Sequence, residues 1–494
     1  MLILKREPRL DPRHQAFLYQ VQAVEAVRRL EYAALFHEQG LGKTKIGLDL
    51  ALSWLKEGAV DSVIIVTKRS LIKNWTDEIK THTFFEARIF GQDRNANFFA
   101  FNSPARLYLT HYEVLKSEER RFALFQKTRR IGVILDESQK IKNPEAELTK
   151  TFHKLADGFV RRVIMTGTPV ANRPYDIWAQ IKFLDDGKSL GPSFSEFREN
   201  LDLTNDLADN RGAQSDFEEQ LASIFSKIQP FCVRETKGSA GIELPEKLIE
   251  NVPVQLEEAQ QQLYERFRKA LRAQVLRGGE LVEDDAEEIL KRLLRLVQVA
   301  SNPLLVDESY RGVPGKLVAA RKLIDSALGS GSKAIIWTNF IANADWLARQ
   351  FKDSGTVVVH GKKAIADRNA ALDKFKNDPD IKILVATPAS AKEGLTLTVA
   401  NHAVFFDRSF SLDDYLQAQD RIHRISQTKE CHIWNLVASG TVDDWVDMLL
   451  AAKHLAAQLA QGDIDSDEYR KQANYDFGRV VRGMLKAGEE HGST

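Results

Sequence analysis

A short glycine-rich segment, Gly40-Leu41-Gly42-Lys43-Thr44, contains the residue types that bind a nucleotide phosphate. Glycines let the backbone curl so that its N–H groups point at phosphate oxygens. Lys43 can then reach the β- and γ-phosphates, and the Thr44 hydroxyl can bind Mg²⁺. The strict pattern places a glycine six residues before the lysine, where this chain has His37. Taken alone, the segment also fits an ordinary glycine turn before a helix.

Two adjacent carboxylates, Asp136 and Glu137, follow the apolar run 133–135. Open α/β sheets bind ligands at the carboxyl ends of their strands, which is where these side chains would lie. Asp136 suits a Mg²⁺ shell, and Glu137 suits the orientation of an attacking water. Alone, the pair is equally compatible with a solvated acidic turn. Together with the glycine-rich segment upstream, it predicts a nucleotide-hydrolysis site.

Two arginines, Arg421 and Arg424, are three residues apart in QAQDRIHRISQ. In a helix, this spacing would put both guanidinium groups on the same face. Such a pair, directed across a cleft, would stabilise the charge on a γ-phosphate in the transition state. A solvated basic helix face is the alternative. The turn 166–169 (TGTP) follows the apolar run 163–165 and either links the hydrolysis site to neighbouring surfaces or simply ends a strand.

The elements that must position these residues follow an alternating pattern in the first third of the chain. Short apolar runs predict buried strands, and longer amphipathic stretches between them predict helices. The predicted strands are 63–66, 107–109, 131–135 and 163–165, and the predicted helices are around 17–30, 44–57 and 70–80. This alternation predicts a parallel sheet covered by helices on both faces.

The pattern changes to charged, helix-like sequence from about 185 to 300 and returns to strand–helix alternation from about 315. Strands are expected in the second alternating region at 334–337, 357–359, 383–385, 403–406 and 433–436. The predicted fold class is α/β, with two parallel-sheet lobes and a helical insert. The predicted domains are a first lobe at 1–185, the insert at 186–305, a second lobe at 306–445 and a helical tail at 446–494.

Composition excludes several classes of protein. The 69 basic and 69 acidic side chains balance, so a histone-like polycation is excluded, whereas a local basic groove is not. The chain has two cysteines, which are far apart in the sequence. They are too few for a Cys-rich zinc site, and they argue against a disulfide scaffold. The histidines are scattered without paired ligand spacing, so no metal beyond nucleotide Mg²⁺ is expected. No signal peptide and no membrane-spanning run is recognised, and we expect a cytoplasmic protein.

Several further segments occur in an order that resembles the Swi/Snf-type DNA translocases of helicase superfamily 2. DESQKIKN is similar to the family's DEAHRIKN, MTGTPVANRPYDIW to LTGTP…N…ELW, and QAQDRIHRISQ to QAxDRxHRxGQ. LIKNWTDEI, LPEK, LVQVASNPLL and EGLTLTVAN also resemble landmarks of the family. The resemblance covers about residues 15–445. It implies two RecA-like lobes and an ATPase that moves along duplex DNA, most similar to compact bacterial or phage members.

Carried onto this sequence, the resemblance implies the following roles. Gln20 contacts adenine; Gly40, Leu41, Gly42, Lys43 and Thr44 hold phosphates and Mg²⁺; Asp136 and Glu137 are the Mg²⁺ and water residues; Gly394 lies at the cleft; Arg421 and Arg424 are arginine fingers. The residues expected to track a DNA backbone are Lys68, Ser70, Thr110, Tyr112, Thr338, Asn339 and Thr387.

The chain departs from the family pattern at a few positions. Ser138-Gln139 replace Ala-His, Lys68 stands where the family usually has proline, Ala23 replaces a glycine, and Ser426 replaces the last glycine. The Ser138-Gln139 change bears on the coupling between hydrolysis and movement, not on hydrolysis itself.

The expected activity is DNA-stimulated hydrolysis of ATP coupled to translocation on duplex DNA. A strand-separating or fork-remodelling helicase is the enzymatic alternative. A nucleic-acid-binding scaffold with an inactive ATPase site is a further alternative, against which the retained Lys43, Asp136, Glu137, Arg421 and Arg424 argue. The last alternative is a nucleotide-binding signalling switch that does not bind nucleic acid.

Overall fold

The computed structural model describes residues 4, 6–170, 172–199, 201–203, 207, 210–277, 280–281, 293–391 and 396–475. The chain divides into two compact units. Unit 1 comprises Met1–Leu201, Gln220–Glu243 and Ala460–Gly462. Unit 2 comprises Asp202–Glu219, Leu244–Leu459 and Asp463–Thr494.

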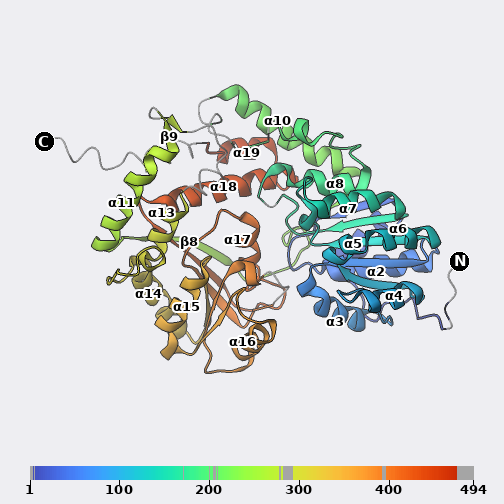
Figure 1. Ribbon diagram of the computed structural model, residues 1–494, viewed down its shortest axis with the longest axis horizontal. Helices are drawn as coiled ribbons and strands as arrows, with labels where there is room; N and C mark the ends of the chain where they lie inside the picture. Colours follow the sequence, from blue (N-terminus) through green and yellow to red (C-terminus); the bar gives the residue numbers. More distant parts are fainter. Residues whose placement is uncertain are drawn as a thin grey trace. The chain divides into compact units, whose positions relative to one another are not determined.

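Unit 1 is built on a seven-stranded parallel sheet with the strand order β3-β4-β2-β5-β6-β1-β7. Helices of unit 1 lie beside the strands of this sheet (Figure 1). The strands are β1 (Tyr32–Leu35), β2 (Ser62–Thr67), β3 (Arg88–Ile89), β4 (Leu107–His111), β5 (Ile131–Asp136), β6 (Arg161–Met165) and β7 (Cys232–Val233). Every residue of the central strands β2 and β5 is buried. Their continuous apolar sequences require cover on both faces, which is the usual situation of a parallel sheet.

Helices alternate with the strands of unit 1 along the chain. They are α1 (Leu18–Val27), α2 (Lys43–Lys56), α3 (Ile72–His82), α4 (Arg94–Asn102), α5 (Tyr112–Ser117), α6 (Glu119–Thr128), α7 (Glu147–Leu155), α8 (Trp178–Asp185) and α9 (Phe194–Arg198). The Trp54 indole of α2 packs so closely on β5 that a Cβ at Gly132 would lie 3.0 Å from it. This close approach explains a glycine in the middle of a buried strand.

Unit 2 is built on a six-stranded parallel sheet with the order β12-β13-β11-β14-β15-β8. The strands are β8 (Lys247–Val254), β11 (Lys333–Trp337), β12 (Thr356–Val359), β13 (Ile383–Ala386), β14 (Ala400–Phe405) and β15 (Cys431–Ala438). Alternate residues of β11 enter separate cores on the two faces: Ala334 and Ile336 join one cluster, and Ile335 and Trp337 join the other. This is the two-residue period of a strand.

The helices assigned to unit 2 include α11 (Glu258–Val275), α13 (Leu294–Ser301), α14 (Gly315–Gly329), α15 (Ile341–Gln350), α16 (Ile365–Asn377), α17 (Leu412–Gln419) and α19 (Ser466–Gln472). A short antiparallel pair joins β9 (Leu276–Arg277) to β10 (Glu280–Leu281). Helices α10 (Arg211–Ile228) and α18 (Val442–Ala460) contain residues of both units.

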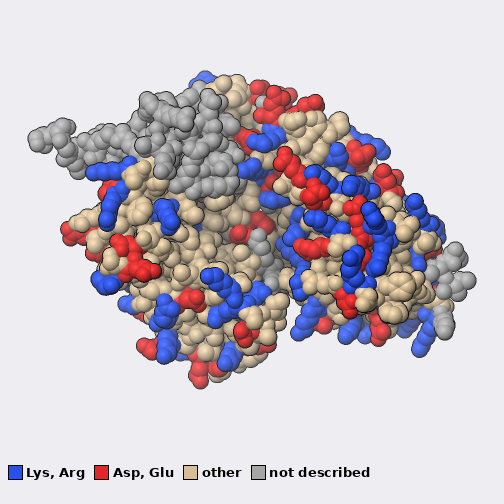
Figure 2. All heavy atoms as spheres, in the orientation of Figure 1, with Lys and Arg blue, Asp and Glu red and all other residues tan. Residues whose placement is uncertain are grey.

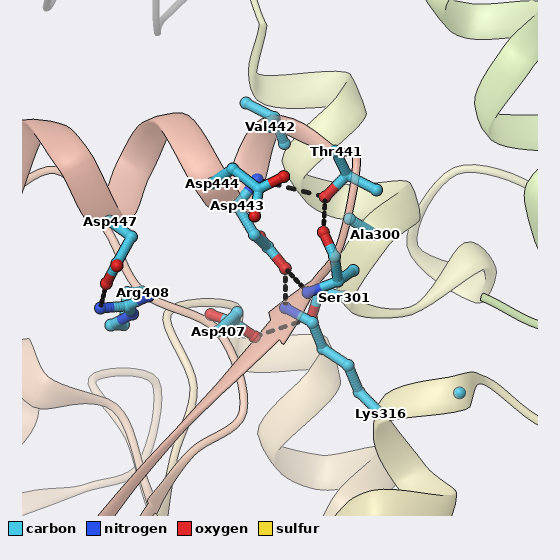
Figure 3. A network of polar contacts seen from close by, with 12 residues as sticks. Ala300, Ser301, Lys316, Asp407, Arg408, Thr441, Val442, Asp443, Asp444 and Asp447 are labelled. Atoms are coloured by element: carbon cyan, nitrogen blue, oxygen red, sulfur yellow. Dashed lines mark hydrogen bonds and ion pairs between the residues drawn. The ribbon is translucent and has the colours of Figure 1, made fainter. Parts of the chain in front are cut away.

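A buried polar network ties helices of unit 2 to its sheet (Figure 3). The Asp407 carboxylate, just after β14, accepts a hydrogen bond from the Ser301 hydroxyl at 2.7 Å. Lys316 of α14 is fully buried and pairs with Asp443 of α18 at 2.5 Å. Because buried charges are stable only when paired, these contacts fix α13, α14 and α18 in place.

The predicted α/β fold with two RecA-like, parallel-sheet lobes is confirmed. The segment 186–305, expected to be helical, also contributes one strand to each sheet, β7 and β8. These strands were missed because β7 is two residues long and β8 has Glu250, Asn251 and Pro253 in its sequence. The domain boundaries remain a prediction, and residues 476–494 of the expected tail lie outside the described residues. Within the described ranges, no helix has the length and apolar character needed to cross a bilayer.

Candidate active site

The glycine-rich segment forms the turn between β1 and α2, as the sequence predicts. Gly40 and Gly42 have φ angles of 90° and 70°, in the left-handed region that favours glycine. The half-buried Lys43 begins α2, and its Nζ donates to the carbonyl oxygens of His37 at 2.9 Å and Glu38 at 3.1 Å. The ammonium therefore lies within the loop's own curve, at the N-terminus of a helix, where an anion is favoured.

Gln20 of α1 braces this loop. Its Nε2 donates to the carbonyl oxygen of Leu41 at 3.2 Å, and its Oε1 accepts from the backbone N–H of Phe17 at 3.0 Å. A Cβ at Gly42 would lie 2.5 Å from the same Nε2, so both φ and space require glycine there. The predicted adenine contact of Gln20 stays a prediction.

A segment almost 200 residues downstream supports the other side of the loop. The Arg234 guanidinium donates to the carbonyl oxygen of Phe36 at 2.7 Å, and Lys237 pairs with Glu38 at 3.1 Å. His37, at the position of the missing glycine, is fully buried. Burial, and next the charge of Lys43, lowers the pKa of His37 to about 4, so His37 is neutral at pH 7.

Asp136 ends β5 and is held by three donors. Its Oδ2 accepts from the Thr67 hydroxyl at 3.0 Å and the Trp75 indole N–H at 2.8 Å, and its carbonyl oxygen accepts from the Tyr112 hydroxyl at 2.7 Å. Burial, and next the charge of Glu137, raises the pKa of Asp136 to about 6, while Lys43 acts in the opposite direction. Strands β1 and β5 both pair in parallel with β6, so the phosphate loop that follows β1 and the carboxylates at the end of β5 lie at the same edge of the unit 1 sheet.

Glu137 is one of two described residues other than glycine with positive φ, at φ 55° and ψ 50°. Such backbone strain clusters at functional sites. Its carboxylate oxygen Oε2 lies 3.3 Å from Lys68 Nζ and also accepts from the Gln139 amide. Glu137 is therefore positioned by both its backbone and two neighbouring side chains.

The two predicted arginine fingers lie in turns, so the expected shared helical face is wrong. Helix α17 ends at Gln419, before both residues. Arg421 is buried, whereas the half-buried Arg424 donates from Nε to the carbonyl oxygen of Asp420 at 2.8 Å and from Nη1 to the Thr396 hydroxyl at 3.2 Å. The turn persists because the Gln427 amide donates to the carbonyl oxygens of Ile422 at 2.9 Å and Ala400 at 3.0 Å.

The seven predicted DNA contacts divide into two groups. The side chains of four are buried: Thr110, Tyr112, Thr338 and Thr387. Their hydroxyls donate within their own unit, as Thr338 does to Asp407 at 2.6 Å, so this structure does not support contact of their side chains with a phosphate. The other three, Lys68, Ser70 and Asn339, are at least partly accessible and stay predictions. Gly394 lies outside the described residues.

The oxygen donors present fit the Mg²⁺ that the sequence predicts. Mg²⁺ prefers oxygen ligands, usually one or two carboxylates or hydroxyls together with phosphates and water. Thr44 on α2 and Asp136 on β5 supply a hydroxyl and a carboxylate. Among the residues that the structure describes, no group of three or more His, Cys, Asp or Glu side chains forms another metal site.

Comparison with known protein families identifies the family of this chain. The SNF2-related domain matches residues 19–305, more than half of the chain, and the helicase conserved C-terminal domain matches residues 315–426. The chain belongs to the SNF2-related family. The resemblance predicted from its motifs is confirmed.

Among SNF2-related relatives, an uncharacterized ATP-dependent helicase of Mycoplasma pneumoniae is 27% identical over 88% of this chain and 41% of its own length. The putative ATP-dependent helicase/translocase YwqA of Bacillus subtilis is 26% identical over 87% of this chain and 47% of its own. The ISWI chromatin-remodeling complex ATPase ISW1 of Saccharomyces cerevisiae is 25% identical over 95% of this chain and 42% of its own. The chain thus spans less than half the length of these relatives.

A solved structure, the Sulfolobus solfataricus SWI2/SNF2 ATPase core in complex with dsDNA, is 25% identical, with a TM-score of 0.42. That similarity covers 96% of this chain and 99% of the other.

Several residues of this SNF2-related site were missed by sequence reasoning. Trp75 and Thr67 orient Asp136, and Arg234 braces the phosphate loop. Gly167 of the TGTP turn lies against Gln39, because a Cβ there would be 2.8 Å from the Gln39 amide nitrogen. The lone signal was position: Thr67 directly follows the predicted strand 63–66, and in the structure β2, which ends at Thr67, lies beside β5, which ends at Asp136.

Proposed function

We propose that this chain is a DNA-stimulated ATPase that translocates on duplex DNA and uses the movement to remodel DNA or protein–DNA complexes. The observation that supports this proposal most strongly lies in unit 1, where the phosphate loop that contains Lys43 and the carboxylates of Asp136 and Glu137 converge. Membership of the SNF2-related family over residues 19–305 supports the same proposal.

The proposed reaction is ATP + H₂O to ADP + phosphate. The loop N–H groups and Lys43 bind the phosphates, and Gln20 contacts the adenine while it braces the loop. Thr44 and Asp136 would hold Mg²⁺, which when bound neutralises charge on the phosphates. Glu137 orients the attacking water and accepts its hydrogen bond.

Arg421 and Arg424 of unit 2 are proposed to complete the site by stabilising the charge on the transferring phosphoryl group. Their placement in turns braced by Gln427, and not on a helix, supports a fixed rather than a mobile pair. Nucleotide turnover would then open and close the two lobes, and each would hold the DNA backbone in alternation.

DNA binding is proposed to depend on phosphate contacts, with Lys68, Ser70 and Asn339 among the donors. On the face in view, basic and acidic side chains are interspersed (Figure 2), which agrees with a net charge of zero. We therefore expect few effective phosphate contacts and a shallower dependence of affinity on salt than for a strongly basic protein. The bacterial relatives favour the cytoplasm of a bacterial or phage-infected cell as the compartment.

The proposal is tested by measuring ATP hydrolysis without nucleic acid and with duplex DNA, single-stranded DNA or RNA. Duplex DNA should give the largest stimulation. Displacement of a third strand from a triplex, without unwinding of a forked duplex, is the expected result of duplex translocation. Efficient fork unwinding with no stimulation by duplex DNA would instead support the strand-separating helicase.

A further inference from the structure

Two side chains beside the site, those of Lys68 and Gln139, contact the same oxygen of Glu137. Lys68 Nζ lies 3.3 Å from Glu137 Oε2, and the Gln139 amide donates to that same oxygen. Two side chains therefore converge on the carboxylate proposed to orient water.

The sheet register places Lys68 beside Glu137. Strands β2 and β5 are neighbouring parallel strands in which Val66 pairs with Leu135. Lys68 and Glu137 each lie two residues beyond that pair, so their side chains emerge from the same edge of the sheet. The Thr67 hydroxyl donates to Oδ2 of Asp136 at 3.0 Å. This hydrogen bond joins the two residues that directly precede Lys68 and Glu137. The pairing of β2 with β5 therefore places the two residues of the ion pair next to each other.

The pair lies near the surface. The Lys68 side chain is 18% exposed and that of Glu137 is 14% exposed. The next residues, Arg69 and Ser70, are exposed. A phosphate at this loop would meet the Lys68 ammonium, and such partly exposed ion pairs are weak enough for a competing anion to exchange.

We propose that Lys68, aided by Gln139, is a positioning residue that holds the Glu137 carboxylate in an idle state, and that a DNA backbone phosphate releases it by competing for the Lys68 ammonium. This inference rests on the proposed function. An ammonium on Oε2 occupies an acceptor site and lowers the ability of the carboxylate to bind the attacking water. Withdrawal of Lys68 toward a phosphate restores that ability, so hydrolysis is stimulated by contact with the DNA backbone.

The main test is Lys68→Met, which keeps the aliphatic stem and removes the charge. ATP hydrolysis without DNA should rise by about fivefold or more, the lower end of coupling between linked sites, and stimulation by duplex DNA should shrink correspondingly. Lys68→Arg keeps a cation and should retain low basal turnover. Lys73→Met, at an exposed lysine of α3, is the matched control and should behave like the wild type.

A second measurement tests the Lys68–Glu137 ion pair without relying on ATP hydrolysis. Coupling is reciprocal, so Glu137→Gln should bind duplex DNA more tightly than the wild type in the absence of nucleotide, because Lys68 is released. The gain should vanish in Lys68→Met/Glu137→Gln. The salt slope of DNA binding should be smaller by about 0.9 in Lys68→Met, corresponding to one lost phosphate contact.

The outcomes separate the two proposals. Equal loss of basal and DNA-stimulated turnover in Lys68→Met, or unchanged basal turnover and an unchanged salt slope, would overturn the role of Lys68 while leaving the ATPase proposal intact. Wild-type protein without DNA-stimulated hydrolysis would instead overturn the proposed function. If Lys68→Met did not fold, tighter DNA binding by Glu137→Gln than by the wild type would support the pair, and equal affinities would overturn it.

Discussion

The Ser138 hydroxyl donates to Oε1 of Gln180 at 2.7 Å, and both side chains are fully buried. The Nε2 of the same amide donates to the carbonyl oxygens of Pro169 at 3.0 Å and Asp176 at 2.9 Å. Gln180 of α8 therefore joins the turn after Glu137 to the TGTP turn. Ser138 replaces the alanine of the family pattern, so its hydroxyl adds a contact that alanine does not make.

We expect Ser138→Ala to lower the free energy of unfolding of unit 1 by about 1–3 kcal/mol, because the buried Gln180 Oε1 loses its donor. Gln180→Ala should cost a similar amount, and the double variant should cost less than the sum, with a coupling of about 0.5–3 kcal/mol. Urea titration measures these differences. Ser195→Ala, at an exposed serine, is the control, and additive effects of the two buried changes would contradict the link.

We expect Lys43→Ala and Glu137→Gln to abolish hydrolysis for different reasons. Lys43→Ala removes a charge from the phosphates, so ATP affinity should fall together with turnover. Glu137→Gln keeps the shape of the side chain and removes the charge that orients water, so ATP should still bind. Equilibrium binding of a fluorescent ATP analogue separates the two. Near-normal turnover of Glu137→Gln would show that another residue orients the water.

The strands that carry the site could be predicted because their signal is local. The run Ile131–Leu135 is apolar and rich in β-branched residues, so the strand and the carboxylates that follow it were both recognised. The phosphate loop was equally recognisable, since φ angles of 90° and 70° demand glycine at positions 40 and 42.

The residues that brace the site could not be predicted, because their partners are far away in the sequence. Arg234 reaches Phe36 across 198 positions, and Trp75 reaches Asp136 across 61. Spacing alone also misassigned Arg421 and Arg424 to a helix, since the side-chain bonds of Gln427 favour turns there. Tyr112 had the right chemistry for phosphate contact, whereas burial directs its hydroxyl to the backbone carbonyl oxygen of Asp136.

His37 should make the stability of unit 1 sensitive to acid. Its folded-state pKa of about 4 lies below the ordinary value of 6.5, mainly through burial. As pH falls below 6.5, the unfolded chain takes up the proton first, so stability that is intact above pH 6.5 is lost as pH approaches 4. At about 1.4 kcal/mol per pKa unit, the loss is at most about 3.5 kcal/mol. Urea titrations at pH 7 and 4.5 should show a smaller drop for His37→Gln than for the wild type; equal drops would contradict this assignment.

Arg424→Ala should leave the binding of ATP and DNA nearly intact and lower turnover by about 10³-fold or more, as loss of an arginine finger does. In unit 2, the Arg424 guanidinium donates to the Asp420 carbonyl oxygen and the Thr396 hydroxyl, contacts that hold it in place. Arg424→Lys keeps the charge but loses the planar fork, so it should recover only part of the rate. Lys429→Ala, at an exposed position of the same loop, should retain wild-type turnover. Single-turnover hydrolysis with saturating ATP and duplex DNA measures the effect on the chemical step. Full DNA-stimulated turnover of Arg424→Ala would show that Arg424 is an ordinary surface residue and that the transition-state charge is stabilised elsewhere.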